Sequence, residues 1–371
     1  MILKYMIRYQ KWNLISHLEK LKGALNMKKF LIFALVLLVT LTACNKGSDA
    51  SSTDATAEKS AAKTYTIKLG HTMSTSHPRH QALLKFEEYV EDKSNGQIQV
   101  ELFPGGVLGS EPEMQESMRM GTLEAFVGGP FDTISKKLNL FLMPFFFDNQ
   151  EDLMRVARNE EVFNIVSSDA ENGGLKILAI GDGGARQITN SKRRIDEPAD
   201  MKGLKLRTPS IEAIMVCMKT LGASTVSIPL ADCYMSLKTG VADGQENPIA
   251  TIYDQKLHEV QKYITYVNYQ YHPEVFIMNA KFFNSLPADI QQILSDGAWY
   301  FIETENKIAI ENEKVRVEEM KEAGCDVYVP TAEEKQAFID ACEPVYSHFV
   351  NELKYFSQDE LDLVKSIAQG N

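Results

Sequence analysis

The feature that most constrains the fold is a long, uninterrupted helical pattern near the C-terminus. From Pro287 to Ala323 there is no further proline and only one glycine, Gly297, and apolar residues recur among alternating acidic and basic ones. Proline favours a helix start, and Gly324 is a stop signal. A single helix of this length would measure about 55 Å at 1.5 Å per residue, which exceeds the width of one domain. The pattern therefore predicts a helix that runs along two lobes.

The rest of the body alternates short apolar runs with helical patterns, which predicts an α/β protein. The strand candidates are Thr66–Leu69, Ile98–Phe103, Ala125–Val127, Lys176–Ile180, Leu204–Arg207, Thr225–Ile228 and Val275–Met278, and the helical patterns lie near 80–93, 111–120, 151–171, 210–221 and 230–239. Ligands of such sheets sit beyond the carboxyl ends of the strands.

Two lobes can be assigned on this pattern. We expect a first lobe over 64–184, completed by segments after about 270, and a second lobe over 185–270, completed by C-terminal segments. The spanning helix occupies 287–323, and 331–371 forms a C-terminal helical segment.

The N-terminal region contains a complete secretory signal that begins after residue 1. From Met27, two lysines precede an apolar run from Phe30 to Leu41, and two small residues lead to Cys44. A basic start, about a dozen apolar residues and small residues before a cut site form a signal peptide, and the run is too short for a permanent membrane span. We interpret 27–43 as the signal and 1–26 as the result of an upstream start-codon assignment.

The Leu-Thr-Ala-Cys ending resembles the lipobox of bacterial lipoproteins, which implies that Cys44 becomes the lipidated first residue of the mature chain. Residues 44–63 are rich in Ser, Ala, Thr and Asp and lack apolar periodicity, which is typical of a flexible tether. A lipid at the tip of a tether anchors a protein to a membrane without spanning it. We therefore expect an exported protein on the periplasmic or extracytoplasmic face.

The charge of the exported part argues against nucleic acid as a partner. The formal net charge is -11, and residues 1–43 hold seven Lys and Arg against one Glu, so the remainder has 32 basic and 49 acidic residues, or -17. Such a surface repels phosphates. Affinity for an anion would have to come from local cationic groups in a pocket, which makes individual arginines informative.

No motif indicates a metal, a cofactor or catalysis. The four cysteines after Cys44 lack metal-ligand spacing; they could pair in three ways or remain core thiols. The three histidines between 71 and 80 have no nearby carboxylate, so we expect no metal site. Neither Gly-x-Ser-x-Gly nor His-Glu-x-x-His occurs, which favours binding without turnover over an exported hydrolase. A ligand-binding partner of a membrane sensor is a third alternative.

Several motifs occur in order between about Tyr65 and Asp340, among them "IKLGHTMSTSHPRH", "ARQITNSKRRI", "MKGLKLRTPS" and, most specific, "VADGQENP". In this order they resemble the substrate-binding subunits of TRAP (tripartite ATP-independent periplasmic) transporters, dicarboxylate-binding type. The resemblance implies a two-lobed binding protein with a long spanning helix. It implies closure over a small organic acid and delivery of that acid to a separate membrane permease.

Arg207 is the strongest candidate for ligand binding. It ends a strand candidate just before a helix start, and its planar guanidinium can grip a carboxylate through two hydrogen bonds. The alternative is a surface arginine paired with Glu212. The resemblance favours the first interpretation, because Arg207 falls on the arginine of the family's "GLK-L/I-R" motif that clamps the substrate carboxylate.

The resemblance implies further ligand-binding residues. Arg186 follows the Gly-rich segment "GDGG", which we interpret as a turn, and falls at a second substrate-facing arginine; a phosphate-loop interpretation is weak because no Gly-Lys-Ser/Thr follows. Asn247 offers a donor and an acceptor, although it could instead cap a turn before Pro248. The remaining candidates for the pocket wall, which the resemblance does not specify, are His77, for which we expect both a helix-start and a pocket-wall role, Asp182 and Glu212.

Overall fold

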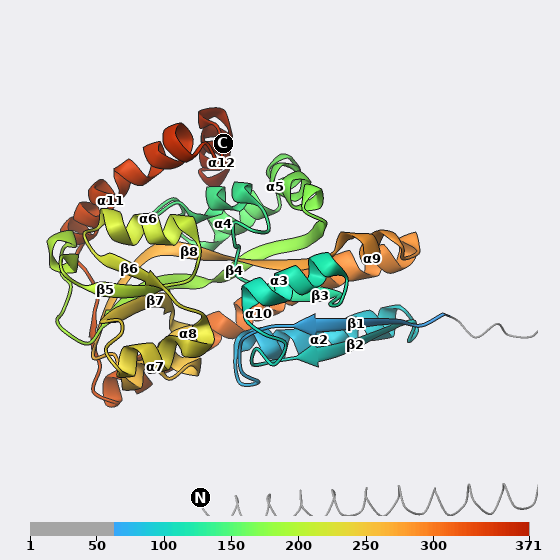
Figure 1. Ribbon diagram of the computed structural model, residues 1–371, viewed down its shortest axis with the longest axis horizontal. Helices are drawn as coiled ribbons and strands as arrows, with labels where there is room; N and C mark the ends of the chain where they lie inside the picture. Colours follow the sequence, from blue (N-terminus) through green and yellow to red (C-terminus); the bar gives the residue numbers. More distant parts are fainter. Residues whose placement is uncertain (1–62, 371) are drawn as a thin grey trace, which may run out of the picture. The chain divides into compact units, whose positions relative to one another are not determined.

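The computed structural model describes residues 63–370. The predicted signal peptide, Cys44 and nearly all of the predicted tether lie outside the described residues. Within residues 63–370 the strands form one nine-stranded sheet in the order β2-β1-β3-β8-β4-β7-β5-β6, with β9 paired to β8 (Figure 1). The strands are β1 Tyr65–Gly70, β2 Ile98–Phe103, β3 Ala125–Gly128, β4 Leu175–Asn190, β5 Lys205–Thr208, β6 Ser224–Ser227, β7 Gly244–Pro248, β8 Tyr263–Asn279 and β9 Asp326–Tyr328.

Helices cover this sheet and confirm the predicted α/β class. The α-helices are α2 Pro78–Lys93, α3 Glu111–Met120, α4 Gln150–Ala157, α5 Glu160–Asn172, α6 Glu212–Thr220, α7 Cys233–Lys238, α8 Ile249–Asp254, α9 Ala280–Asn284, α10 Ala288–Glu322, α11 Ala332–Ser347 and α12 Gln358–Ala368. Short 3-10 segments are η1 Lys136–Leu142, η2 Pro198–Met201, η3 Leu230–Asp232 and η4 Leu257–Glu259, and the π-helical turn η5 spans His348–Leu353. No helix of the described part is both long and apolar enough to cross a membrane.

Strands β4 and β8 are the long connections of the sheet. They have 16 and 17 residues and pair antiparallel along their length, β4 between β8 and β7. The sequence predicted only the apolar start of β4, Lys176–Ile180, and the apolar end of β8, Val275–Met278. It also predicted a turn at the Gly-rich segment before Arg186, which is wrong, because that segment continues inside β4. The glycines instead accompany a register shift between Asp182 and Ala185, and Gly184 has a φ of 101°, which suits glycine.

The helical pattern over 151–171 is interrupted in the structure. Helix α4 ends at Ala157 and α5 begins at Glu160. Asn159 separates them because its side chain accepts hydrogen bonds from the backbone N–H groups of Glu161 and Val162, which caps the second helix. The sequence pattern is apolar on one face through both helices and does not reveal the break.

The long helix expected over Pro287–Ala323 is observed as α10, with Pro287 at its N-cap and Ala323 at its C-cap. Its first half packs into an apolar cluster with α2, β1 and β2, to which it contributes Leu294 and Phe301. Near its end, Met320 belongs to a different cluster that includes α7 and α8. The helix therefore contributes to two separate cores, as expected of an element shared by two lobes.

Candidate functional site

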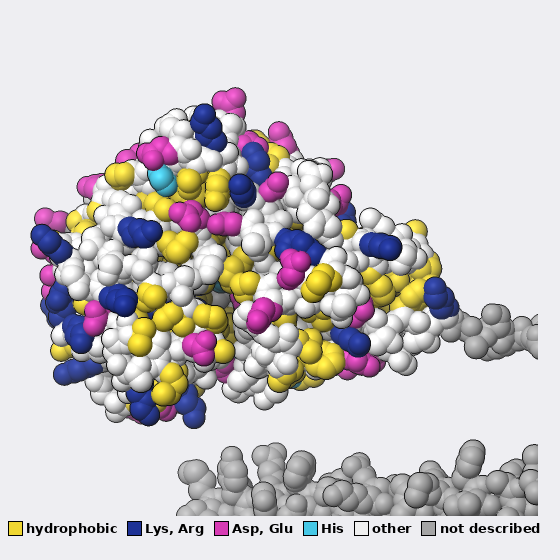
Figure 2. Space-filling model, in the orientation of Figure 1, with side chains coloured by type: hydrophobic (Ala, Val, Ile, Leu, Met, Phe, Trp, Pro, Cys, Tyr) yellow, Lys and Arg dark blue, Asp and Glu magenta, His cyan; other side chains and the backbone are white. Residues whose placement is uncertain are grey.

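A cavity of about 670 Å³ lies between the part of the fold that contains α2 and α3 and the part that contains β5 and β7. This volume is within the range of small-molecule sites, roughly 300–1,000 Å³. Its walls come from the β1–α2 loop and the starts of α2 and α3 on one side, and from β5, η3 and the β7–α8 junction on the other. In Figure 2 a narrow hollow separates the part built on β5–β7 from the part built on β1–β3, and acidic and basic side chains are interspersed around it.

Four of the six predicted ligand-binding residues line this cavity, namely His77, Arg186, Arg207 and Asn247. Asp182 and Glu212 are not among its lining residues. The Asp182 carboxylate is buried and accepts a hydrogen bond from the N–H of Gly184 at 2.9 Å. Glu212 is half-buried at the start of α6, where its N–H donates to Asp132 Oδ2 at 3.3 Å. Contact with ligand remains a prediction for all six.

Arg207 brings an uncompensated positive charge to the cavity. It is 2 % exposed, and its Nε donates to the carbonyl oxygen of Ile228 at 2.8 Å. No carboxylate of the described residues lies within 4.0 Å of its guanidinium, so the alternative pairing with Glu212 does not occur. Burial lowers the pKa of Arg207, because desolvation disfavours the charged form. A buried, unpaired guanidinium of this kind is a strong site for an anion.

Arg186 has a different environment, because its charge is balanced within the protein. Its Nη2 donates to Glu246 Oε1 at 2.9 Å, and its Nε contacts the other oxygen of the same carboxylate. Tyr269 also donates to Glu246. Burial acts to lower the pKa of Arg186, but Glu246 and Tyr269 together outweigh burial, and the pKa rises. Arg186 is therefore held rigidly within strand β4. The sequence had led us to expect it after a mobile turn.

Asn247 is linked to the same group of side chains. Its Oδ1 accepts a hydrogen bond from Arg186 Nη2 at 3.2 Å, and its Nδ2 donates to Gln245. It lies within β7, opposite Gln187 of β4, so the proposed turn cap before Pro248 does not form. The side chain is 6 % exposed and lines the cavity.

His77 caps helix α2 and also faces the cavity. Its Nδ1 accepts a hydrogen bond from the N–H of Arg79 at 3.1 Å, whereas its buried Nε2 has no hydrogen-bond partner among the described residues. Burial lowers the pKa of His77 well below its usual value, and Arg79 lowers it further. The helix-start role and the pocket-wall role thus belong to one side chain.

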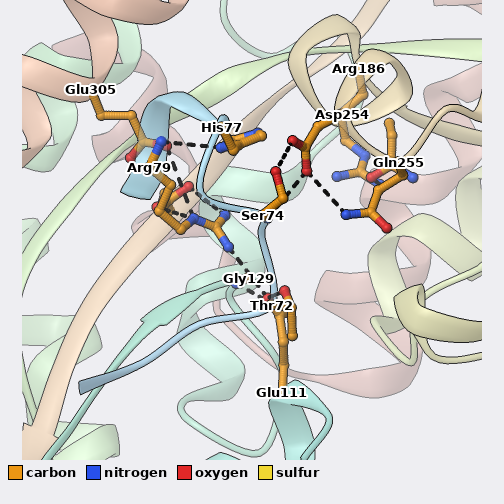
Figure 3. Close-up of polar contacts among 12 residues, drawn as sticks. Thr72, Ser74, His77, Arg79, Glu111, Gly129, Arg186, Asp254, Gln255 and Glu305 are labelled. Atoms are coloured by element: carbon orange, nitrogen blue, oxygen red, sulfur yellow. Dashed lines mark hydrogen bonds and ion pairs between the residues drawn. The ribbon is translucent and has the colours of Figure 1, made fainter. Parts of the chain in front are cut away.

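Arg79 was not predicted from sequence, yet it lines the cavity (Figure 3). Its Nε and Nη2 donate to the two oxygens of Glu274 at 2.7 and 2.6 Å. Glu111 and Glu305 lie farther away, at 3.6 and 4.0 Å. These acids come from β8, α3 and α10, so their convergence on Arg79 has no local signal in the sequence. The one available cue was the position of Arg79 two residues after His77.

Polar contacts also join the β1–α2 loop, on one side of the cavity, to the end of α8 on the other. Ser74 in the β1–α2 loop donates to the Asp254 carboxylate through both its N–H and its hydroxyl (Figure 3). Ser76 Oγ also donates to Asp254 Oδ1, at 3.1 Å. Asp254 is the last residue of α8. Ser74 lines the cavity, so these contacts bring the two walls together.

Comparison with known proteins identifies the chain. Residues 69–353 match bacterial extracellular solute-binding protein, family 7. The chain belongs to this family. It is therefore a solute-binding protein and not an enzyme. Residues 27–45 match the prokaryotic membrane lipoprotein lipid attachment site, which supports the predicted export and the lipid anchor at Cys44.

Relatives in this family bind different acids. The chain is 31% identical to the 2,3-diketo-L-gulonate-binding periplasmic protein of Escherichia coli over 74% of this chain and 84% of that protein. It is 30% identical to the C4-dicarboxylate-binding periplasmic protein of Rhodobacter capsulatus over 77% and 87%. A TRAP periplasmic solute-binding protein of Haemophilus influenzae with bound L-gulonate superimposes with a TM-score of 0.74 at 29% identity, covering 82% and 98%.

Proposed function

We propose that this protein captures a small organic acid outside the cytoplasm, with the carboxylate of the acid bound by Arg207, and delivers it to a TRAP-type membrane permease. The observation that carries the proposal is the buried Arg207 guanidinium, which lines the cavity and has no carboxylate partner among the described residues. Arg186 and Asn247 support it from β4 and β7, since both already lie in the same wall. The acids bound by the relatives give the ligand class to test.

Thermal unfolding with a panel of organic acids tests the proposal. A ligand present at 1,000 times its Kd stabilises the native state by about 4.1 kcal/mol. We therefore expect at least one sugar acid, keto acid or dicarboxylate to raise the melting temperature clearly, and the Arg207→Ala protein to lose that response. If no carboxylate in the panel stabilises the wild-type protein, the proposal fails.

Delivery to a permease requires a test in cells. We expect a strain that lacks this protein to lose uptake of the labelled acid found by the panel, and uptake to return with the wild-type chain. Uptake that persists without the chain would separate capture from transport and favour a sensory role.

We also propose that translation starts at Met27 and that residues 1–26 are not made. The complete signal from Met27 to Ala43 supports this start. Mass spectrometry of membrane-extracted protein should find an acylated peptide beginning at Cys44. A mature chain that retains residues 1–26 would contradict this proposal.

A further inference from the structure

We infer that His77 and Arg79 form a second ligand subsite that donates hydrogen bonds to uncharged oxygens, so that this protein selects hydroxy or keto monocarboxylates over dicarboxylates. The inference rests on the proposed function, because it assumes that Arg207 holds the carboxylate of the same ligand. It concerns the other wall of the cavity, at the start of α2.

Two buried donors of this wall have no hydrogen-bond partner within the described part of the chain. They are His77 Nε2 and Arg79 Nη1, and each residue is 3 % exposed and lines the cavity. A buried polar group without a partner costs about 1–3 kcal/mol, so native proteins rarely leave such a group unsatisfied. Ligand oxygens that accept hydrogen bonds from these donors would remove that cost.

The hydrogen-bond pattern fixes which atom of His77 can donate. Nδ1 accepts a hydrogen bond from the N–H of Arg79, so the neutral ring carries its hydrogen on Nε2. The neutral form is favoured by burial, by the neighbouring Arg79 guanidinium and by the positive end of α2. Nε2 is therefore an N–H donor, which suits a hydroxyl or carbonyl oxygen of the ligand.

The charge of this wall distinguishes it from the Arg207 wall. The Arg79 charge is neutralised by the two hydrogen bonds to Glu274. Glu111, which also lines the cavity, adds a carboxylate at 3.6 Å from Arg79 Nη1. Glu305 lies at 4.0 Å from Arg79 Nε, and burial raises the pKa of Glu305 well above its usual value. Whether it is neutral or ionised, Glu305 adds no positive charge to this wall. The group as a whole is not cationic.

A second carboxylate of a ligand would therefore meet Glu111 without a compensating cation, and like charges in a partly desolvated site repel. A hydroxyl group would meet favourable partners, since it can accept from His77 Nε2 or Arg79 Nη1 and donate to Glu111. The Glu111 oxygens accept only from Thr72 Oγ1 at 2.9 Å and the N–H of Gly129 at 3.4 Å among the described residues, and each carboxylate oxygen has two acceptor sites.

Matched ligands test this selection. A panel of C4–C6 sugar acids is titrated calorimetrically, and the tightest is compared with the unsubstituted monoacid and the diacid of equal chain length; for L-gulonate these are hexanoate and adipate. We expect the sugar acid to bind at least about tenfold more tightly than either, which corresponds to about 1.4 kcal/mol. A diacid that binds as tightly as the sugar acid would overturn the inference and leave Arg207 as the carboxylate site untouched.

Two conservative variants separate a subsite from a structural role. His77→Asn keeps an oxygen that can cap α2 but removes the Nε2 donor, and Arg79→Lys keeps the charge beside Glu274 but removes the second arm of the guanidinium. We expect each to weaken sugar-acid binding about tenfold and to change binding of the unsubstituted monoacid less than twofold. Arg158→Lys, at an exposed ion pair with Glu303, is the matched control and should change neither.

An equal loss for both ligands would show that the variants disturb the fold and would overturn the inference. If none of the acids binds the wild-type protein, the proposed function fails, and the inference fails with it. If the acids bind but Arg207→Ala does not weaken them, the assignment of the carboxylate to Arg207 fails, and the inference, which assumes that assignment, fails with it.

Discussion

The two arginines predicted from sequence differ in what balances their charge. Arg186 is paired with Glu246 through both oxygens, whereas Arg207 donates only to the carbonyl of Ile228 among the described residues. Sequence placed both in the pocket but could not show this difference, because Glu246 lies 60 positions from Arg186. The pairing changes what a substitution at each position should do.

Replacing Arg207 by Ala should weaken ligand binding by a few hundredfold or more and leave the melting temperature nearly unchanged. The variant leaves the ligand carboxylate without its cation, a loss of roughly 3–5 kcal/mol, and each 1.4 kcal/mol is about tenfold. It strands no carboxylate of the protein itself. Arg207→Lys should recover part of the loss, since it keeps the charge but not the fork. Calorimetric titration and thermal unfolding of the same samples measure both effects.

Arg186→Ala is the informative counterpart. It leaves Glu246 buried and unpaired, which typically destabilises a protein by about 3–5 kcal/mol. We therefore expect a large fall in its melting temperature, and a milder fall for Arg186→Lys.

For Arg207, the contradicting outcome is an Arg207→Ala protein that binds ligand within about threefold of wild type. That result would rule out Arg207 as the carboxylate clamp.

Asp182 predicts a pH dependence of stability. Burial raises its pKa to about 7, helped by Glu313 and Glu274 and opposed by the Gly184 N–H, whereas unfolded aspartate titrates near 3.9. Between these values the native state binds more protons than the unfolded state, so this residue's contribution to stability is full below about pH 4 and is lost as the pH rises through about 7. Asp182→Asn keeps an acceptor for Gly184 and removes the titration.

We therefore expect Asp182→Asn to be more stable than wild type at about pH 8, with a difference that shrinks toward about pH 4. Denaturant unfolding at several pH values measures it, and the slope should not exceed about 1.4 kcal/mol per pH unit for one proton. A difference that stays constant with pH would mean that the carboxylate does not titrate in this range.

At the scale of elements, the sequence located those whose pattern is local. Strand β2 and helix α3 have the predicted bounds, and α10 differs by one residue at each end. The sequence pattern did not predict β7, because its residues Gly244–Pro248 are largely polar and do not alternate as in a typical strand. That strand forms because β4 and β5 flank it on both sides. Non-local pairing of this kind cannot be read from a short window of sequence.

The contact between α2 and α10 depends on Gly297. A Cβ added at this position would lie 2.6 Å from Val90 Cγ1 and 3.0 Å from Phe86 Cε2, so the two helices could not approach as closely with a larger residue. We expect Gly297→Val to destabilise the protein by about 1–3 kcal/mol through overpacking. Lys307→Val, at an exposed position of the same helix, controls for the helix propensity of valine. Equal melting temperatures for the two variants would contradict a close helix contact.

At the scale of the whole described body, β4 and β8 cross the predicted boundaries between the lobes near residues 184 and 270, and α10 contributes to two cores. The two strands shift register between Asp182 and Ala185, close to where we predict the lobes to meet, near residue 184. Bulged pairs bend more readily than regular ladders, and a few such residues can absorb a hinge rotation. The sequence predicted the spanning helix but only a short part of each of these strands. In β4 the glycines after Ile180 indicated a turn where the strand continues.

We predict that ligand binding closes the lobes about these strands. The contacts of Ser74 and Ser76 with Asp254 join the walls of the cavity and would be lost on opening. Small-angle scattering should give a smaller radius of gyration with a verified ligand than without it. Asp254→Ala should weaken binding by about threefold to tenfold, chiefly through faster dissociation, because it removes hydrogen bonds made only when the walls meet. Asp340→Ala, on the surface of α11, is the control.

The variant and the scattering experiment together decide whether these contacts act through closure. If Asp254 stabilises the closed state, its loss should increase the dissociation rate for every ligand by a similar factor, since Asp254 contacts the β1–α2 loop in the structure and is not among the residues that line the cavity. The His77 and Arg79 variants should instead discriminate between ligands. An unchanged radius of gyration in wild type would mean a rigid pocket, and the bulges in β4 and β8 would then serve only to position Arg186.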